Sequence, residues 1–229
     1  MSESSRGVRF DRGAKLVIVF ALLLVTGSVA QIVYRFTLPS DGWAVLTEEV
    51  ADTNWLYYQN LVGAASDLQI DDAVLDVEGV SLAGTASTSY VPAPPGWQKG
   101  HTVTMLVRRD GVPVEVAVPV VGWTGKALLT RNILDPVQFA SVSGALLLMV
   151  VGWFTMLRRP EVPSALALLI LSTAVGATSI SGILPDGLSV QFDHTAFLMT
   201  GFFSYIIFGT LLAPSLLVFT CLLYTSPSP

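Results

Sequence analysis

The chain has 229 residues, of which 52% are hydrophobic and only 13% are charged, so its composition differs from that of an average water-soluble domain. Its formal net charge is −5, which gives no basis for the positively charged face that nucleic-acid-binding proteins need. Apolar residues are gathered into a few long runs, whereas most acidic residues lie between positions 36 and 135. Composition therefore indicates a membrane protein with one sizeable polar insert.

Four apolar runs are long enough to cross about 30 Å of hydrocarbon at about 1.5 Å per residue. They are residues 16–35, 136–157, 162–184 and 195–220. Cytoplasmic flanks of such runs carry an excess of Lys and Arg. Residues 1–15 are basic, Arg158 and Arg159 fill the turn between the second and third runs, and the loop before the fourth run has no Lys or Arg. We therefore predict a multi-pass protein with a cytoplasmic N-terminus and with the insert, residues 36–130, outside the cytoplasm.

The first run also has the features of a cleaved signal peptide. A basic start precedes an apolar run, and Ser28 and Ala30 have the small-residue spacing of a cleavage site. The uncharged run continues through Tyr34, which favours a retained span. Both alternatives place the insert outside the cytoplasm.

Alternation of apolar and polar residues predicts strands in the insert. Leu75 and Val77 alternate with acidic residues before Gly79 breaks the run. Residues 102–108 and 114–120 also alternate, and the Asp110-Gly111 pair between them is a two-residue hairpin signal. Two prolines remove backbone donors from the second hairpin strand, which is therefore predicted at a sheet edge. The side chains expected in the core are Leu75, Val77, Val103, Val107, Val114 and Val116.

Two segments of the insert together resemble a bacterial-type PDZ domain. They read GAASDLQIDDAVLDVEGVSL from position 63 and GHTVTMLVRRDGVPVEVAVPV from position 100. The matching positions are Leu68, Asp72, Val74, Val77, Gly79, Gly100, Val103, Val107, Arg109, Asp110 and Gly111. Asp67 and Asp71 stand where such domains usually carry glycine. The predicted fold class is therefore a four-span α-helical bundle with an inserted, mainly β, PDZ-like domain outside the cytoplasm.

PDZ domains bind an extended peptide as an added strand at an open sheet edge. The resemblance therefore implies an extracytoplasmic peptide or protein as partner, with the ligand-binding surface near residues 55–63. The residues predicted to contact the ligand are Trp55, Tyr57, Tyr58, Leu61 and Gly63. A structural PDZ-like domain without a ligand is the alternative.

No sequence motif for catalysis is found. His101 and His194 have no partner at metal-ligand or catalytic-triad spacing, and the His-Glu-x-x-His zinc motif is absent. The interiors of the apolar runs also lack the ionisable residues that transporters and proton pumps place in the membrane. We therefore expect no enzymatic activity, no cofactor, no metal site and no nucleic-acid partner, with the lipid bilayer as the constant partner.

The order of the segments resembles the input region of bacterial membrane sensors, including competence-type quorum-sensing histidine kinases. In these proteins one span and an outer domain precede several closely spaced spans. The resemblance implies a two-component signalling protein of the bacterial cytoplasmic (inner) membrane, which would act as a homodimer if it is a sensor kinase. The alternatives are a membrane-tethered PDZ scaffold or protease adaptor without signalling output, and a secretion-system component.

Residues 221–229, which read CLLYTSPSP and hold the only cysteine, resemble a translated sequencing adapter. We therefore expect this tail to be artefactual and an output domain to follow position 220 in the complete gene. A natural tail rich in Ser and Pro is the alternative.

The predicted orientation can be tested by cysteine labelling with a reagent that does not cross the membrane. A cysteine introduced at Ser87, in the insert, should be modified from outside the cell. A cysteine at Glu161, in the turn after Arg158 and Arg159, should stay unmodified because that turn is predicted to be cytoplasmic. The reverse pattern would overturn the orientation.

Overall fold

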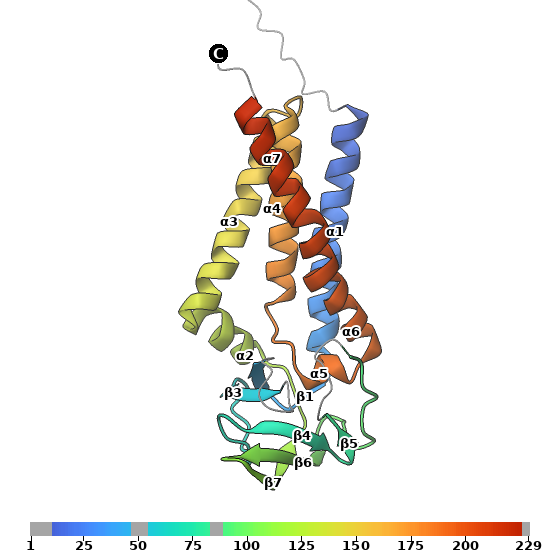
Figure 1. Ribbon diagram of the computed structural model, residues 1–229, viewed down its shortest axis with the longest axis vertical. Coiled ribbons are helices and arrows are strands. Elements are labelled where there is room, and N and C mark those ends of the chain that lie inside the picture. Colours follow the sequence, from blue (N-terminus) through green and yellow to red (C-terminus); the bar gives the residue numbers. More distant parts are fainter. Residues whose placement is uncertain (1–10, 47–54, 83–88, 226–229) are drawn as a thin grey trace, which may run out of the picture. The chain divides into compact units, whose positions relative to one another are not determined.

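The computed structural model describes residues 11–46, 55–82 and 89–225 (Figure 1). The chain forms two units. The first, which we call the helical unit, comprises Met1–Val29, Ala140–Ser181 and Phe203–Pro229. The second, the sheet unit, comprises Ala30–Phe139 and Gly182–Phe202.

Within the described residues, four helices are long and apolar enough to cross a membrane by length and composition. Their bounds are Arg12–Phe36 (α1), Pro136–Arg158 (α3), Pro163–Ser181 (α4) and the helical run His194–Leu222. That last run contains α6 (His194–Gly201), the π-helical segment η2 (Phe202–Leu212) and most of α7 (Ala213–Thr225). Helix α4 ends at Ser181, three residues before the predicted end of the third run. The prediction of four apolar helices is confirmed, and their placement in a bilayer stays a prediction.

Close packing in the helical unit depends on small residues of α3 and α4. A Cβ atom added at Gly152 would lie 2.0 Å from the Ser172 Oγ atom, 2.8 Å from the Ser172 Cβ atom and 3.2 Å from the backbone oxygen of Leu168. One turn of α4 further on, a Cβ atom added at Gly176 would lie 2.8 Å from the Met149 sulfur atom. Helices α3 and α4 therefore approach each other closely where glycine removes the side chain.

A second face of α4 packs against α1 and the last helical run. Ala174 and Ala177 of α4 are buried in one cluster with Leu24 of α1 and with Phe203 and Ile207 of η2. Because α4 has buried contacts on both sides, it is the central helix of the unit.

The sheet unit contains one main antiparallel sheet. Its strands follow the order β2-β3-β4-β6-β7, and β5 pairs with β4. The bounds are Trp43–Leu46 (β2), Leu56–Asn60 (β3), Ala73–Val77 (β4), Val80–Ser81 (β5), Thr102–Arg109 (β6) and Val112–Pro119 (β7). Two further short strands, β1 (Pro39–Ser40) and β8 (Val121–Gly122), pair with each other. The helical segments of this unit also include α2 (Gly125–Leu129), the π-helical segment η1 (Thr130–Leu134) and α5 (Leu188–Gln191).

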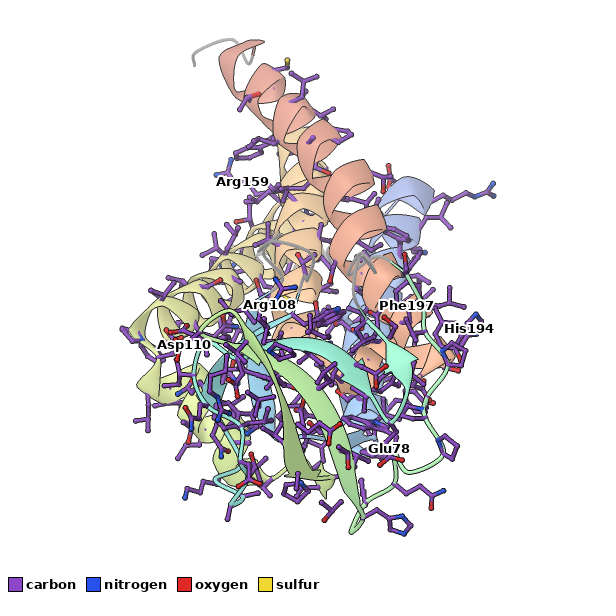
Figure 2. All side chains as sticks on the ribbon, turned by 60° about the horizontal axis from the view of Figure 1, so that its bottom comes forward. Glu78, Arg108, Asp110, Arg159, His194 and Phe197 are labelled. Carbon is purple, nitrogen blue, oxygen red and sulfur yellow. The ribbon has the colours of Figure 1, made fainter. Side chains whose placement is uncertain are left out.

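The predicted hairpin is confirmed. Strands β6 and β7 pair antiparallel, with Val103 opposite Val118 and Val107 opposite Val114. At the turn, where Figure 2 labels Asp110, the φ angles of Asp110 and Gly111 are 52° and 81°. Positive φ at both central residues is the signature of the type I′ turn that matches strand twist. Strand β7 ends the strand order, as predicted for an edge strand.

The predicted core is correct except at Leu75 of β4. The four predicted residues Val77, Val103, Val107 and Val116 are buried, and Val114 is partly buried against them. The prediction for Leu75 is wrong, because this residue is only half-buried. A register shift between Val74 and Asp76 marks a β-bulge, so Val74 and Val77 both face the core. Simple alternation fails across such a bulge.

The contact at Gly152 predicts that Gly152→Ala destabilises the helical unit. The added methyl group would force α3 away from Ser172, at a cost of about 1–3 kcal/mol. The matched control is Gly144→Ala on the same helix, because a Cβ atom there would meet nothing within 4 Å. Thermal unfolding in detergent, followed by circular dichroism, should show a lower midpoint for Gly152→Ala only. Equal midpoints for both variants would contradict the close contact.

Candidate functional site

Helix α5 lies in the connection between α4 and α6, and it completes the core of the sheet unit. Leu188 and Phe192 are buried in one cluster with the core side chains of the main sheet. The Phe192 ring meets the Trp97 ring edge-on, with the ring centroids 5.0 Å apart. The backbone N–H of Val91 also donates to the Gln191 oxygen (3.3 Å). Burial of a Leu or Phe side chain stabilises by about 1.5–3 kcal/mol, so this connection is a packed part of the domain.

The last turn of α1 holds the start of the same connection. The Arg35 Nη2 atom donates to the backbone oxygens of Leu184 (3.1 Å) and Pro185 (2.8 Å). It also donates to the Asp186 carboxylate at 3.0 Å. The Arg35 side chain is 2% exposed, whereas that of Asp186 is 49% exposed. A buried guanidinium is costly unless it is paired and hydrogen-bonded, and here three acceptors offset that cost.

Side chains from three elements bind the backbone carbonyl groups that follow α4. The Gln138 Nε2 atom of α3 donates to the Gly182 oxygen (3.2 Å), and the Asn132 Nδ2 atom of η1 donates to the Ile183 oxygen (3.0 Å). Arg35 binds the next carbonyl group, as described above. The segment that follows α4 is therefore held within the sheet unit by side chains far away in the sequence.

The start of α6 is tied to α1 as well. The Asp193 carboxylate accepts hydrogen bonds from the Ala196 backbone N–H (2.8 Å) and from the Tyr34 hydroxyl (3.1 Å to each oxygen). It therefore acts as the N-cap of α6. One turn earlier on α1, the buried Gln31 side chain donates to the Thr200 hydroxyl (2.9 Å). We call residues 182–193, with the side chains that bind them, the α5 junction.

An aromatic contact joins the long connection of the sheet unit to α6. The Tyr90 ring lies 5.1 Å from the His194 ring and 6.2 Å from the Phe197 ring, measured between centroids. Figure 2 shows His194 and Phe197 together on α6. The α5 junction thus receives contacts from the sheet core, from α1 and from Val91, and the neighbouring Tyr90 contacts the first turn of α6.

The five residues predicted to bind a ligand do not form one exposed surface. Trp55, Tyr57 and Leu61 are buried, Tyr58 is partly buried, and only Gly63 is exposed. Tyr57 packs in the main core, whereas Leu61 and Tyr58 pack in a second cluster with Trp123, Ala127 and Leu184. Strand β3 also lies between β2 and β4, so it is not an edge strand. A strand paired on both sides has no free edge for an added peptide, so β3 itself offers none, and ligand binding by these five residues stays a prediction.

Tyr57 instead forms a buried polar pair with Asp41. The Tyr57 hydroxyl donates to the Asp41 Oδ2 atom at 2.5 Å, and the Trp43 backbone N–H donates to the Oδ1 atom at 3.0 Å. Burial raises the pKa of the Asp41 carboxyl, and the hydrogen bonds only partly oppose this rise. Burial and the nearby Asp41 raise the pKa of Tyr57 well above its ordinary value. Tyr57 is therefore a core residue with a bound hydroxyl.

Two residues that carry the PDZ resemblance form an ion pair. Arg109 binds Asp72 through its Nε atom (2.8 Å) and its Nη2 atom (2.6 Å), and it also donates to the Asp67 backbone oxygen (2.8 Å). Asp72 is fully buried and also accepts a bond from the Gln69 N–H (2.8 Å). Asp71 has φ 70°, so it occupies the left-handed conformation that glycine favours. These contacts fix the loop before β4 against the hairpin.

Sequence reasoning missed the α5 junction. Arg35, Asp186 and Asp193 were visible only as charged residues beside apolar runs, which is also the ordinary composition of a membrane flank. Their partners are far away in the sequence, so no local pattern relates them. Among the described residues, no group of three or more His, Cys, Asp or Glu side chains could hold a metal ion.

The unequal burial of the Arg35–Asp186 pair predicts unequal effects of substitution. Arg35→Met should lower the free energy of unfolding by about 3 kcal/mol or more, because it leaves buried carbonyl groups without a donor. Asp186→Ala should cost less, because Arg35 keeps both carbonyl acceptors. Denaturant titration in detergent, followed by tryptophan fluorescence, measures both variants. A larger effect of Asp186→Ala would contradict the importance of the carbonyl contacts.

The raised pKa of Asp41 predicts a pH dependence of stability. As pH rises above about 4, the unfolded chain releases the Asp41 proton while the folded chain still holds it. Wild-type stability should therefore fall relative to Asp41→Asn until pH passes the raised pKa in the folded state. Unfolding measured from about pH 4 to about pH 7 tests this trend. Asp110→Asn, at the exposed hairpin tip, is the control for removing one negative charge.

The chain matches no protein-family model, no curated protein and no solved structure. The likeness to PDZ domains and to bacterial sensors therefore rests on the residues quoted above. Function has to be argued from the geometry of the two units.

Proposed function

We propose that this chain is the sensory input module of a bacterial membrane signalling protein of the histidine-kinase type. In this proposal the four apolar helices cross the inner membrane, and the sheet unit lies outside the cytoplasm. The ligand is an extracytoplasmic peptide or protein, as the resemblance to PDZ domains implies. The chain itself carries out no chemistry.

The observation that carries the proposal is the α5 junction. Leu188 and Phe192 come from the connection between two candidate spans, yet they complete the core of the sheet unit. A change in that core therefore changes the environment of the residues that immediately precede α6. No long flexible linker separates the sheet from the helix.

A two-state mechanism follows from this arrangement. A ligand that favours one packing of Trp97 against Phe192 shifts the equilibrium by its difference in affinity for the two packings, and by no more. Helix α6 continues directly into η2, an 11-residue π-helical segment. π-helical geometry is rare and is often found at functional sites. Conversion of part of η2 between π and α geometry would rotate the residues that follow it, including α7.

The same contacts support a sensor over the alternative, a membrane-tethered scaffold or protease adaptor. A scaffold has only to keep a binding domain near the membrane, and a flexible linker suffices for this. The buried Arg35 side chain and the Asp193–Tyr34 contact instead tie the last turn of α1 to the α5 junction within the sheet unit. This rigidity supports signal transmission over simple tethering.

The proposal predicts that Phe192→Ala changes basal signal output. Residues 1–220 are fused to a histidine-kinase output domain, and autophosphorylation is measured in lipid vesicles. Truncation of a buried Phe costs about 3–5 kcal/mol. If the substitution destabilises one of the two signalling states about 1.4 kcal/mol more than the other, the ratio of the two states changes about tenfold, and the output changes with it. The matched control is Phe139→Ala, because Phe139 is exposed on α3.

Tryptophan fluorescence of each fusion establishes that the sheet unit is folded. A folded Phe192→Ala fusion with wild-type output would end the sensor proposal and leave the tethered scaffold. A similar change in the Phe139→Ala control would show that the effect does not depend on the α5 junction.

A further inference from the structure

The helical segment formed by α2 and η1, residues 125–134, has one face fixed to the sheet unit. Ala127 is buried in a cluster with Leu61, Trp123 and Leu184. The Arg131 Nη1 atom donates to the Tyr58 hydroxyl at 2.7 Å. Asn132 binds the carbonyl group of residue 183, as described above. These contacts set the rotation of the segment about its axis, so the opposite face has a defined direction.

That opposite face is apolar and open. Leu129, Ile133 and Leu134 are 53%, 54% and 69% exposed. Residues four apart lie on one face of an α-helix, and the wider π-helical turn brings residues five apart together. The three aliphatic side chains therefore form one exposed patch, which we call the α2–η1 patch. An apolar patch on a segment whose other face is packed marks an interaction surface.

Two observations select a lipid surface as the partner. First, α3 begins at Pro136, and its first turns expose Val137 and Phe139. The apolar surface of the α2–η1 patch therefore continues into a helix that is long and apolar enough to cross a membrane. Second, the charged residues between 125 and 134 are both cationic, and of these Lys126 is exposed, whereas Arg131 is bound to Tyr58. A short amphipathic helix with an exposed cation suits an interface with anionic lipid headgroups.

The chain also changes direction between the α2–η1 segment and α3. Asp135 is extended, with ψ 111°, and its carboxylate accepts hydrogen bonds from the backbone N–H groups of Val137 and Gln138. It therefore caps the start of α3 and ends η1. The α2–η1 segment is thus separate from α3, as expected for a helix that lies along a surface before a spanning helix begins.

From these observations we infer that the α2–η1 segment is an interfacial helix whose patch is covered by the lipid bilayer. Leu129, Ile133 and Leu134 insert among the headgroups and the upper acyl chains, while Ala127 keeps its packing on the sheet unit. This inference rests on the proposed membrane placement of α3. It adds a second point at which the lipid surface holds the sheet unit, next to the spanning helices themselves.

Site-directed fluorescence quenching tests this assignment in the full chain with Cys221→Ser as background. A bimane probe is attached to Ile133→Cys, and the protein is placed in vesicles of phosphatidylcholine and phosphatidylglycerol. Leu129→Cys provides a second position on the same patch. Two controls are exposed apolar positions, Leu147→Cys on α3 and Val112→Cys next to the hairpin turn. Quenching by lipids brominated at shallow or deep acyl positions is compared with quenching by iodide in water.

The inference predicts that shallow brominated lipids quench the probes at positions 129 and 133 at least about twofold more than iodide does. Deep brominated lipids should quench the probe at position 147, and iodide should quench the probe at position 112. If lipid quenches the probe at position 147 but only iodide quenches the probes at positions 129 and 133, the inference of an interfacial helix is wrong. The membrane placement of α3 then stands. If position 147 is also quenched only by iodide, the proposed function fails with it. Protection of positions 129 and 133 from both quenchers would show that protein, such as a second copy of the chain, covers the patch, and would overturn the inference.

Discussion

The buried Arg35 side chain is the contact on which the arrangement of the sheet unit most depends. It lies in the last turn of α1, and it binds two backbone carbonyl groups and the Asp186 carboxylate. A guanidinium group removed from water is stabilising only when its donors are satisfied. These bonds hold residues 184–186 against the last turn of α1. Leu188 and Phe192 follow directly and are buried in the sheet core.

Helix α5 makes the core of the sheet unit depend on a later part of the chain. An inserted domain with its own complete core would need only its two chain ends to connect it with its neighbours. Here the core is incomplete without Leu188 and Phe192, which belong to a later part of the chain. Folding of the sheet unit and the position of α6 are therefore coupled by ordinary apolar packing. A coupling of this kind is what the proposed sensor mechanism requires.

The helical unit follows a different packing rule. Contacts at Gly152, Gly176, Ala174 and Ala177 bring backbones close together, whereas many large apolar side chains of α1 and α3 are exposed. In water such exposure would be unfavourable. In a bilayer, lipid chains are as apolar as the side chains, so close approach of small residues drives helix association. The proposed membrane placement therefore accounts for both the exposed side chains and the small residues at the contacts.

The sequence by itself determined the four apolar helices, the β6–β7 hairpin and most of the sheet core. These features depend on local composition, on alternation and on the Asp110-Gly111 turn. All three depend on interactions between residues that are close in the sequence. Only the tertiary structure decided the burial of Tyr57 beside Asp41, the β-bulge at Val74 and the contacts of Arg35 with residues about 150 positions later. The physical reason is that periodicity shows which face of an element is apolar, but not which distant segment covers it.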